Sequence, residues 1–156
     1  MIPITMASAF HWIKVKAVCY ATEDEDRIHD TMIALTGADE ESFDVDISEG
    51  LHGNPITVID AELTRSKECE RLFLNLGNDI MLELLDGLED RVDEDDVFYM
   101  RIDKQKAVQG IYEISHTGDV ISITGKIAAH PAKKEIAVRI LNEYLQKLMS
   151  RPAASQ

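Results

Sequence analysis

Basic side chains with aromatic residues between them are the part of this sequence that could do chemistry with a ligand. Lys14 and Lys16 share one face of an apparent strand, and more basic residues follow in the C-terminal part. Lysine and arginine neutralise phosphates, and aromatic rings stack on unpaired bases. The candidate contacts are Lys14, Lys16, Arg101, Lys104, Lys106, Lys126, Lys133 and Lys134, with the rings of Trp12, Tyr20, Tyr99 and Tyr112. An alternative is that these lysines only cover exposed strand faces while the rings pack in the core.

Charge is distributed unevenly along the chain, whose formal net charge is −13 over 156 residues. Residues 1–96 carry 7 Lys and Arg against 24 Asp and Glu, a net −17, whereas residues 97–156 carry 9 against 5, a net +4. A local basic face can attract a polyanion even on an acidic molecule. Salt adaptation or solubility explains the same asymmetry. Nucleic-acid binding therefore requires that folding sorts the charges into a positive patch and a negative remainder.

Motifs of the common catalytic and metal sites do not occur. The sequence has no glycine-rich phosphate loop, no Gly-x-Ser-x-Gly and no His-Glu-x-x-His, and its five histidines have no partner at helical ligand spacing. The acidic run Asp93 to Asp96 lacks the glycine of a calcium loop, and the two cysteines, Cys19 and Cys69, are read as buried hydrophobic residues. We expect no enzyme, no cofactor and no metal, although a hydrolase without a recognised motif stays open.

Periodicity indicates an α+β fold. Alternating residues predict strands over 11–20, 43–48, 56–63, 97–102, 111–115 and 120–128, and helical spacing predicts helices over 23–36, 67–92 with a break at Gly77, and from Pro131 onward. Residues 104–110 are expected to form a basic turn, and residues 111–115 and 120–128 a hairpin. This order favours a mostly antiparallel sheet of about six strands with helices packed on one face and the other face partly open.

The expected organisation is one domain over residues 10–150, with flexible ends at 1–9 and 151–156. No apolar run approaches the roughly 18 residues of a membrane span, and the N-terminus lacks the pattern of a signal peptide. We therefore expect a cytoplasmic protein without membrane contact.

Four short segments resemble the small archaeal proteins described as predicted exosome subunits or RNA-binding proteins of a ribosomal-protein-like α+β fold. The segments are Ala21-Thr22-Glu23-Asp24, His52-Gly53-Asn54-Pro55-Ile56, Asp103-Lys104-Gln105-Lys106-Ala107 followed by Gly110, and Ala129-His130-Pro131-Ala132-Lys133-Lys134. Each is weak alone, but their order and separation make the resemblance fairly specific over about residues 10–141. The resemblance implies RNA binding.

The physical chemistry of these segments agrees with a phosphate ligand. The loop formed by His52, Gly53 and Asn54 can expose backbone donors beside a sheet edge, and Gln105 adds an amide that can read a base edge. Lys133 and Lys134 stand at a helix N-terminus, where the helix dipole disfavours cations, so a bound anion would relieve the mismatch.

These observations favour an RNA-binding accessory protein of archaeal RNA processing or ribosome-related metabolism, associated with the exosome and without catalysis. The alternative is an acidic adaptor, or a homodimeric module, whose helices dock a basic protein of the RNA-processing machinery without touching RNA.

Overall fold

A computed structural model describes residues 8–49, 53–116 and 118–150. The expected flexible tail at 151–156 and most of the expected flexible N-terminus fall outside these residues. The α+β class and the antiparallel sheet are confirmed. Within the described ranges, no helix is both long and apolar enough to span a membrane.

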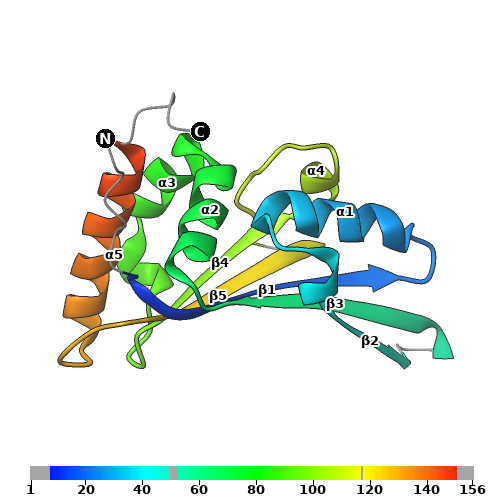
Figure 1. Cartoon of the computed structure of the whole chain (residues 1–156), viewed down its shortest axis with the longest axis horizontal. Coiled ribbons are helices and arrows are strands. Elements are labelled where there is room, and N and C mark those ends of the chain that lie inside the picture. The colour runs from blue at the N-terminus through cyan, green and yellow to red at the C-terminus, as the bar shows by residue number, and fades with distance from the viewer. Residues whose placement is uncertain (1–7, 50–52, 117, 151–156) are drawn as a thin grey trace.

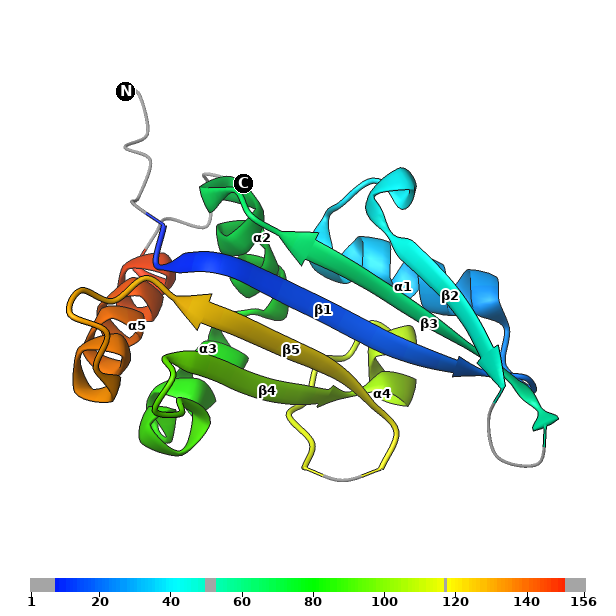
Figure 2. The same cartoon turned by 90° about the horizontal axis from the view of Figure 1, so that it is seen from below.

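Five antiparallel strands form the sheet, in the order β2(Asp44–Glu49), β3(Pro55–Leu63), β1(Phe10–Tyr20), β5(Val120–Ile127) and β4(Val97–Asp103). The helices α1(Glu25–Thr36), α2(Ser66–Leu76), α3(Asn78–Leu85), α4(Lys104–Val108) and α5(Lys134–Met149) lie on one face, as Figure 1 shows. Figure 2 views the opposite face of the sheet, which none of the five labelled helices covers. Single 3-10 turns occupy Glu40–Ser42 and Leu88–Arg91.

Alternation along β1 produces the two-sided sheet that the sequence predicted. Ile13, Val15, Ala17 and Cys19 are buried toward the helices, whereas Lys14 and Lys16 are exposed on the open face. A strand whose neighbouring side chains point to opposite faces separates a core from a solvated surface in this way. The same alternation continues in β4 and β5.

Four aromatic rings from distant parts of the chain form the centre of the core. Phe73 of α2 lies 5.8 Å from Phe10, 6.2 Å from Phe98 and 6.0 Å from Tyr144 between ring centroids. Gly125 of β5 makes this packing possible, because a Cβ atom there would lie 2.8 Å from the Phe10 ring. Close packing of this kind tolerates neither extra nor missing volume.

The predicted hairpin is wrong, and this reduces the strand count to five. Both edges of β5 are occupied, one by β1 and the other by β4, so residues 111–115 cannot pair with it. They lie instead along the outer edge of β4, where Ile114 forms a single bridge with Ile102.

Several helices begin at other residues than the sequence predicted. The expected turn over 104–110 contains α4, which begins after Asp103, whose Oδ1 accepts the Lys106 backbone N–H. Helix α1 begins at Glu25 rather than at residue 23 and is capped by Asp24. The last helix starts at Lys134, three residues after Pro131. For α1 and α4 an aspartate side chain accepts a free N–H group of the first turn, and which residue can do so depends on the path of the preceding chain.

Candidate nucleic-acid interface

Cross-strand pairing assembles one group of basic and aromatic residues on the open face. Opposite Lys14 on β1 stands Thr124 on β5, and opposite Thr124 stands Tyr99 on β4. The adjacent row holds Lys16, Ser122 and Arg101, and the row on the other side holds Trp12, Lys126 and Val97. We call Trp12, Lys14, Lys16, Tyr99, Arg101 and Lys126 the basic stripe.

The cations of the basic stripe differ in how they interact with carboxylates, because Lys126 interacts electrostatically with Asp93. In the described part of the chain, Lys14, Lys16 and Arg101 form no ion pair within 4.0 Å. Lys126 donates its Nζ hydrogen bond to the backbone oxygen of Asp95, which carries no charge. Neighbouring rows on a strand face are about 7 Å apart, so the positive charges form a continuous band.

Acidic residues border this band on the next strands. Glu62 and Asp60 of β3 stand opposite Lys14 and Lys16, and Asp44 of β2 stands opposite Asp60. The boundary between β1 and β3 therefore separates the cations of the basic stripe from the carboxylates of β3 and β2, while Asp93 adds a carboxylate beside Tyr99 at the β4 end of the stripe. A local group of cations can attract a phosphate ligand even on an acidic chain.

Two of the four candidate aromatic residues belong to the stripe. Tyr99 is exposed and donates its hydroxyl to Asp93 Oδ2 at 3.0 Å, while Trp12 is half-buried. The hydrogen bond to Asp93, together with desolvation, raises the pKa of Tyr99, so its hydroxyl stays protonated at neutral pH. Tyr20 is used differently, because its ring lies 5.0 Å from Lys104 Nζ. Tyr112 lies on the helix side of the sheet.

Lys104 is buried, which corrects its assignment as a phosphate contact. Its side chain has no exposed surface, and Nζ lies 2.7 Å from Glu23 Oε1 and 3.0 Å from Asp119 Oδ1. It also donates to the backbone oxygen of Val18. A buried charge with this many partners is part of the fold, because no surface of the ammonium group is left for a ligand.

Gln105 completes the same cluster. Its Nε2 donates to Glu23 Oε2 and to Asp119 Oδ2, both at 2.9 Å. We call Glu23, Lys104, Gln105 and Asp119 the Lys104 cluster. It joins two of the four segments that carried the family resemblance, and it ties the end of β1 to α4 and to the start of β5. The amide predicted to read a base edge is held by these two carboxylates.

A pH dependence follows from Glu23. Burial alone would raise its pKa, but hydrogen bonds from Lys104, from the Tyr20 backbone and from Gln105 outweigh this and hold the pKa below the ordinary 4.5. A pKa lowered by folding stabilises the native state above the ordinary value, and this contribution is lost as pH falls through the lowered value. We expect Glu23→Gln to be less stable than wild type near neutral pH and the difference to shrink below pH 4.5. Urea unfolding of both proteins across this range checks the sign, and a difference independent of pH contradicts it.

The remaining predicted contacts lie away from the stripe. Lys106 pairs with Glu113 at 2.7 Å on the surface. Lys133 is the N-cap and Lys134 the first residue of α5, which lies beyond the end of β5 that carries Lys126 (Figure 2). Gly53 and Asn54 precede β3 at the opposite end of the sheet, and His52 lies outside the described residues. The structure thus unites Lys14, Lys16, Arg101 and Lys126, but not the others.

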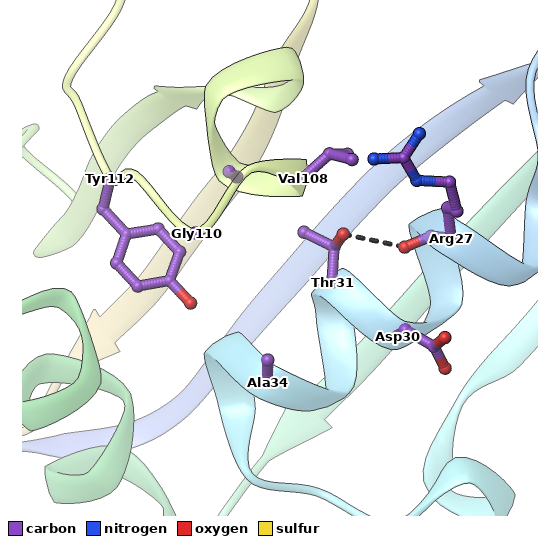
Figure 3. A pocket seen from close by; sticks show the side chains of 8 residues that line it. Arg27, Asp30, Thr31, Ala34, Val108, Gly110 and Tyr112 are labelled. Carbon is purple, nitrogen blue, oxygen red and sulfur yellow. Dashed lines mark hydrogen bonds between the residues drawn. The ribbon is translucent and has the colours of Figure 1, made fainter.

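A pocket of about 300 Å³ lies on the helix side, between α1 on one side and the end of α4 with the segment that follows it on the other. Figure 3 shows Val108 and Tyr112 facing Thr31 and Ala34 across it, with Arg27 at its rim. In the ranges that the structure describes, no group of three His, Cys, Asp or Glu side chains could hold a metal ion.

The fold and the basic stripe together define a class of protein. It is an α+β protein with an open antiparallel sheet, whose exposed cations and aromatic rings can bind an anionic ligand that itself contains aromatic rings. The chain belongs to the family described as RNA binding, whose model matches residues 12–127.

Archaeal relatives match between 70% and 90% of the chain. It is 35% identical over 144 residues to an RNA-binding protein of Pyrococcus abyssi, covering 87% of this chain and 94% of that protein. An uncharacterized protein of Methanocaldococcus jannaschii is 35% identical over 119 residues, 70% of this chain and 78% of that one. The solved structure of a DUF54 protein from Methanothermobacter thermautotrophicus is similar with a TM-score of 0.71 at 33% identity, covering 90% and 98% of the two chains.

Proposed function

We propose that this protein binds unpaired RNA on the open face of its sheet, through the basic stripe, and that it has no catalytic role. The observation that carries the proposal is that Lys14 and Lys16 of β1 and Arg101 of β4 flank β5 on one face, and that in the described part of the chain none of them forms an ion pair within 4.0 Å. Trp12 and Tyr99 lie among them, where they can stack on bases. Unpaired strands are favoured over a duplex because stacking needs bases that are free of their own helix.

The family and the name of the relative in Pyrococcus abyssi support the same ligand. We extend the proposal to an accessory role in archaeal RNA processing, alongside proteins of that machinery such as the exosome. In this role the protein supplies an RNA contact and leaves the chemistry to its partners.

Direct titration tests the proposal. The chain contains one tryptophan, Trp12, so its fluorescence reports a base that stacks on the stripe. We expect a mixed-sequence, single-stranded RNA of about 20 nucleotides to quench this fluorescence at about 50 mM salt and to bind much more weakly at about 200 mM. The triple variant Lys14→Ala, Lys16→Ala, Arg101→Ala should bind at least about tenfold more weakly, with a shallower salt dependence, since each lost phosphate contact removes about 0.7 from the slope.

The control variant removes two cations outside the stripe, Lys133→Ala with Lys134→Ala. It should bind RNA nearly as well as the wild type, because these two cations lie at the start of α5 and not on the sheet face that contacts the RNA in this proposal. No binding at low salt, or equal losses in both variants, contradicts the proposal. The first outcome favours the acidic adaptor that does not touch RNA.

A further inference from the structure

The two edges of the sheet differ in whether another segment of the chain hydrogen-bonds to them. The outer edge of β4 is covered, because the Asp103 N–H donates to the Glu113 oxygen and the Ser115 N–H donates to the Arg101 oxygen, both at 2.9 Å. Strand β2 forms the opposite edge and pairs only with β3. Within the described ranges nothing pairs along its outer side. An open edge presents free N–H and C=O groups that can accept another strand.

Strand β2 also exposes apolar side chains. All six of its residues are exposed, and Val45 and Ile47, two positions apart on one face, have 45% and 74% of their surface accessible. A single exposed apolar residue is ordinary, but an edge strand normally avoids a pair of them because this invites association. An added strand would cover both side chains with its own alternate residues.

The other face of β2 is acidic and internally repulsive. Asp44 stands directly opposite Asp60 across the β2 and β3 pair, and Asp46 follows on the same side. Like charges in directly opposed positions destabilise a sheet. Lys16 lies on the far side of Asp60, but the two make no ion pair within 4.0 Å. A cation arriving from the open side of β2 would relieve this repulsion.

Charge excludes a second copy of this strand as the occupant. Strand β2 carries three carboxylates, Asp44, Asp46 and Glu49, and no cation. Pairing two such strands would add repulsion to that already present, whereas a basic strand would remove it.

We propose that the outer edge of β2 binds an extended, basic segment of a partner protein by strand addition. Backbone hydrogen bonds hold the segment, its apolar residues cover Val45 and Ile47, and its lysine or arginine residues face Asp44 and Asp46. Alternate side chains give such a site its specificity. Strand β3 separates the site from β1, the nearest strand of the basic stripe, and the site does not depend on RNA binding there.

A model peptide tests the site on the full chain. The probe is a fluorescein-labelled peptide of eight residues in which lysine alternates with valine or threonine, and the control peptide has the same composition with its lysines contiguous. We expect the alternating peptide to bind at least about tenfold more tightly, because only its lysines and apolar residues sort to opposite faces of a strand. Hydrogen exchange should show new protection of the backbone amides of 44–49 and not of the helices.

Matched charge reversals locate the binding. The double variant Asp44→Lys, Asp46→Lys should lower the affinity for the alternating peptide at least about tenfold, because the lysines of the peptide would then face like charges on β2. Glu83→Lys with Glu143→Lys changes net charge equally on exposed helix positions and should leave affinity nearly unchanged. The triple stripe variant should still bind the peptide, which separates this site from the RNA proposal.

Several results overturn the inference. They are failure of the alternating peptide to bind, equal affinity for both peptides, equal losses in the two charge reversals, and protection that appears outside β2. A dimer in light scattering whose β2 amides are protected without peptide also overturns it, because a second copy would then occupy the edge.

Discussion

Replacing Lys104 with methionine is expected to lower the free energy of unfolding by about 3 kcal/mol, since removing one partner of a buried ion pair leaves the others uncompensated. The ammonium group lies between Glu23 and Asp119 and has no exposed surface. Methionine fills similar volume but can hydrogen-bond to neither carboxylate. The expected cost lies at the lower end of the usual range because Glu23 and Asp119 keep 18% and 32% of their side-chain surface in water.

Lys106 provides the control two residues further along the same helix. Its ion pair with Glu113 is on the surface, so Lys106→Met should change stability little. Chemical denaturation with urea measures both variants. Equal effects would show that the Lys104 cluster is no more important to the fold than a surface pair. The Lys104 variant should still bind RNA under conditions where it is folded, in contrast to the triple stripe variant.

Phe73→Ala should be similarly damaging and cost about 3 to 5 kcal/mol, the range for removing a fully buried aromatic ring. The ring is completely buried and contacts three others from β1, β4 and α5. Its loss would leave a cavity between α2, α5 and the sheet that cannot close without shifting Phe10 from its place above Gly125.

The neighbouring residue tests whether the effect comes from the cluster or from the helix. Leu74 stands on the exposed side of α2, and Leu74→Ala should change stability by less than about 0.5 kcal/mol. Thermal unfolding followed by circular dichroism compares the pair. A Phe73 variant as stable as the Leu74 variant would contradict the central place of the aromatic cluster.

Local patterns in the sequence predicted the elements that have one face in the core and the other in solvent. Strand β1 has buried Ile13 and Val15 alternating with exposed Lys14 and Lys16, and this contrast is visible without coordinates. Residues 111–115 show the same alternation, yet they form no strand, because β5 already has partners on both edges. Alternating residues indicate that a segment can form a strand. Whether a neighbouring strand has a free edge for it depends on the strand order of the complete sheet.

The candidate site was likewise predicted in part from the sequence and decided in part by the tertiary structure. The sequence identified Lys14, Lys16, Arg101 and Lys126 as cations and Trp12 and Tyr99 as rings that could serve one ligand. It placed Lys104 and Gln105 in the same group, because a lysine in a basic segment looks the same whether it faces water or two carboxylates. The signal that could have separated them was the presence of Glu23 and Asp119 in flanking turns, but their convergence depends on contacts between residues 81 positions apart.

The sequence by itself determined the class of fold, the two-sided strands and the supply of positive charge, because these depend on residue type and on spacing within single elements. Tertiary structure decided which charges remain free. Strand register sets Lys14 beside Thr124 and Tyr99, the turn into α4 carries Lys104 inward, and the strand order leaves β2 uncovered. The physical reason is that the interaction of a charge depends on its neighbours in space, and those neighbours come from distant parts of the chain.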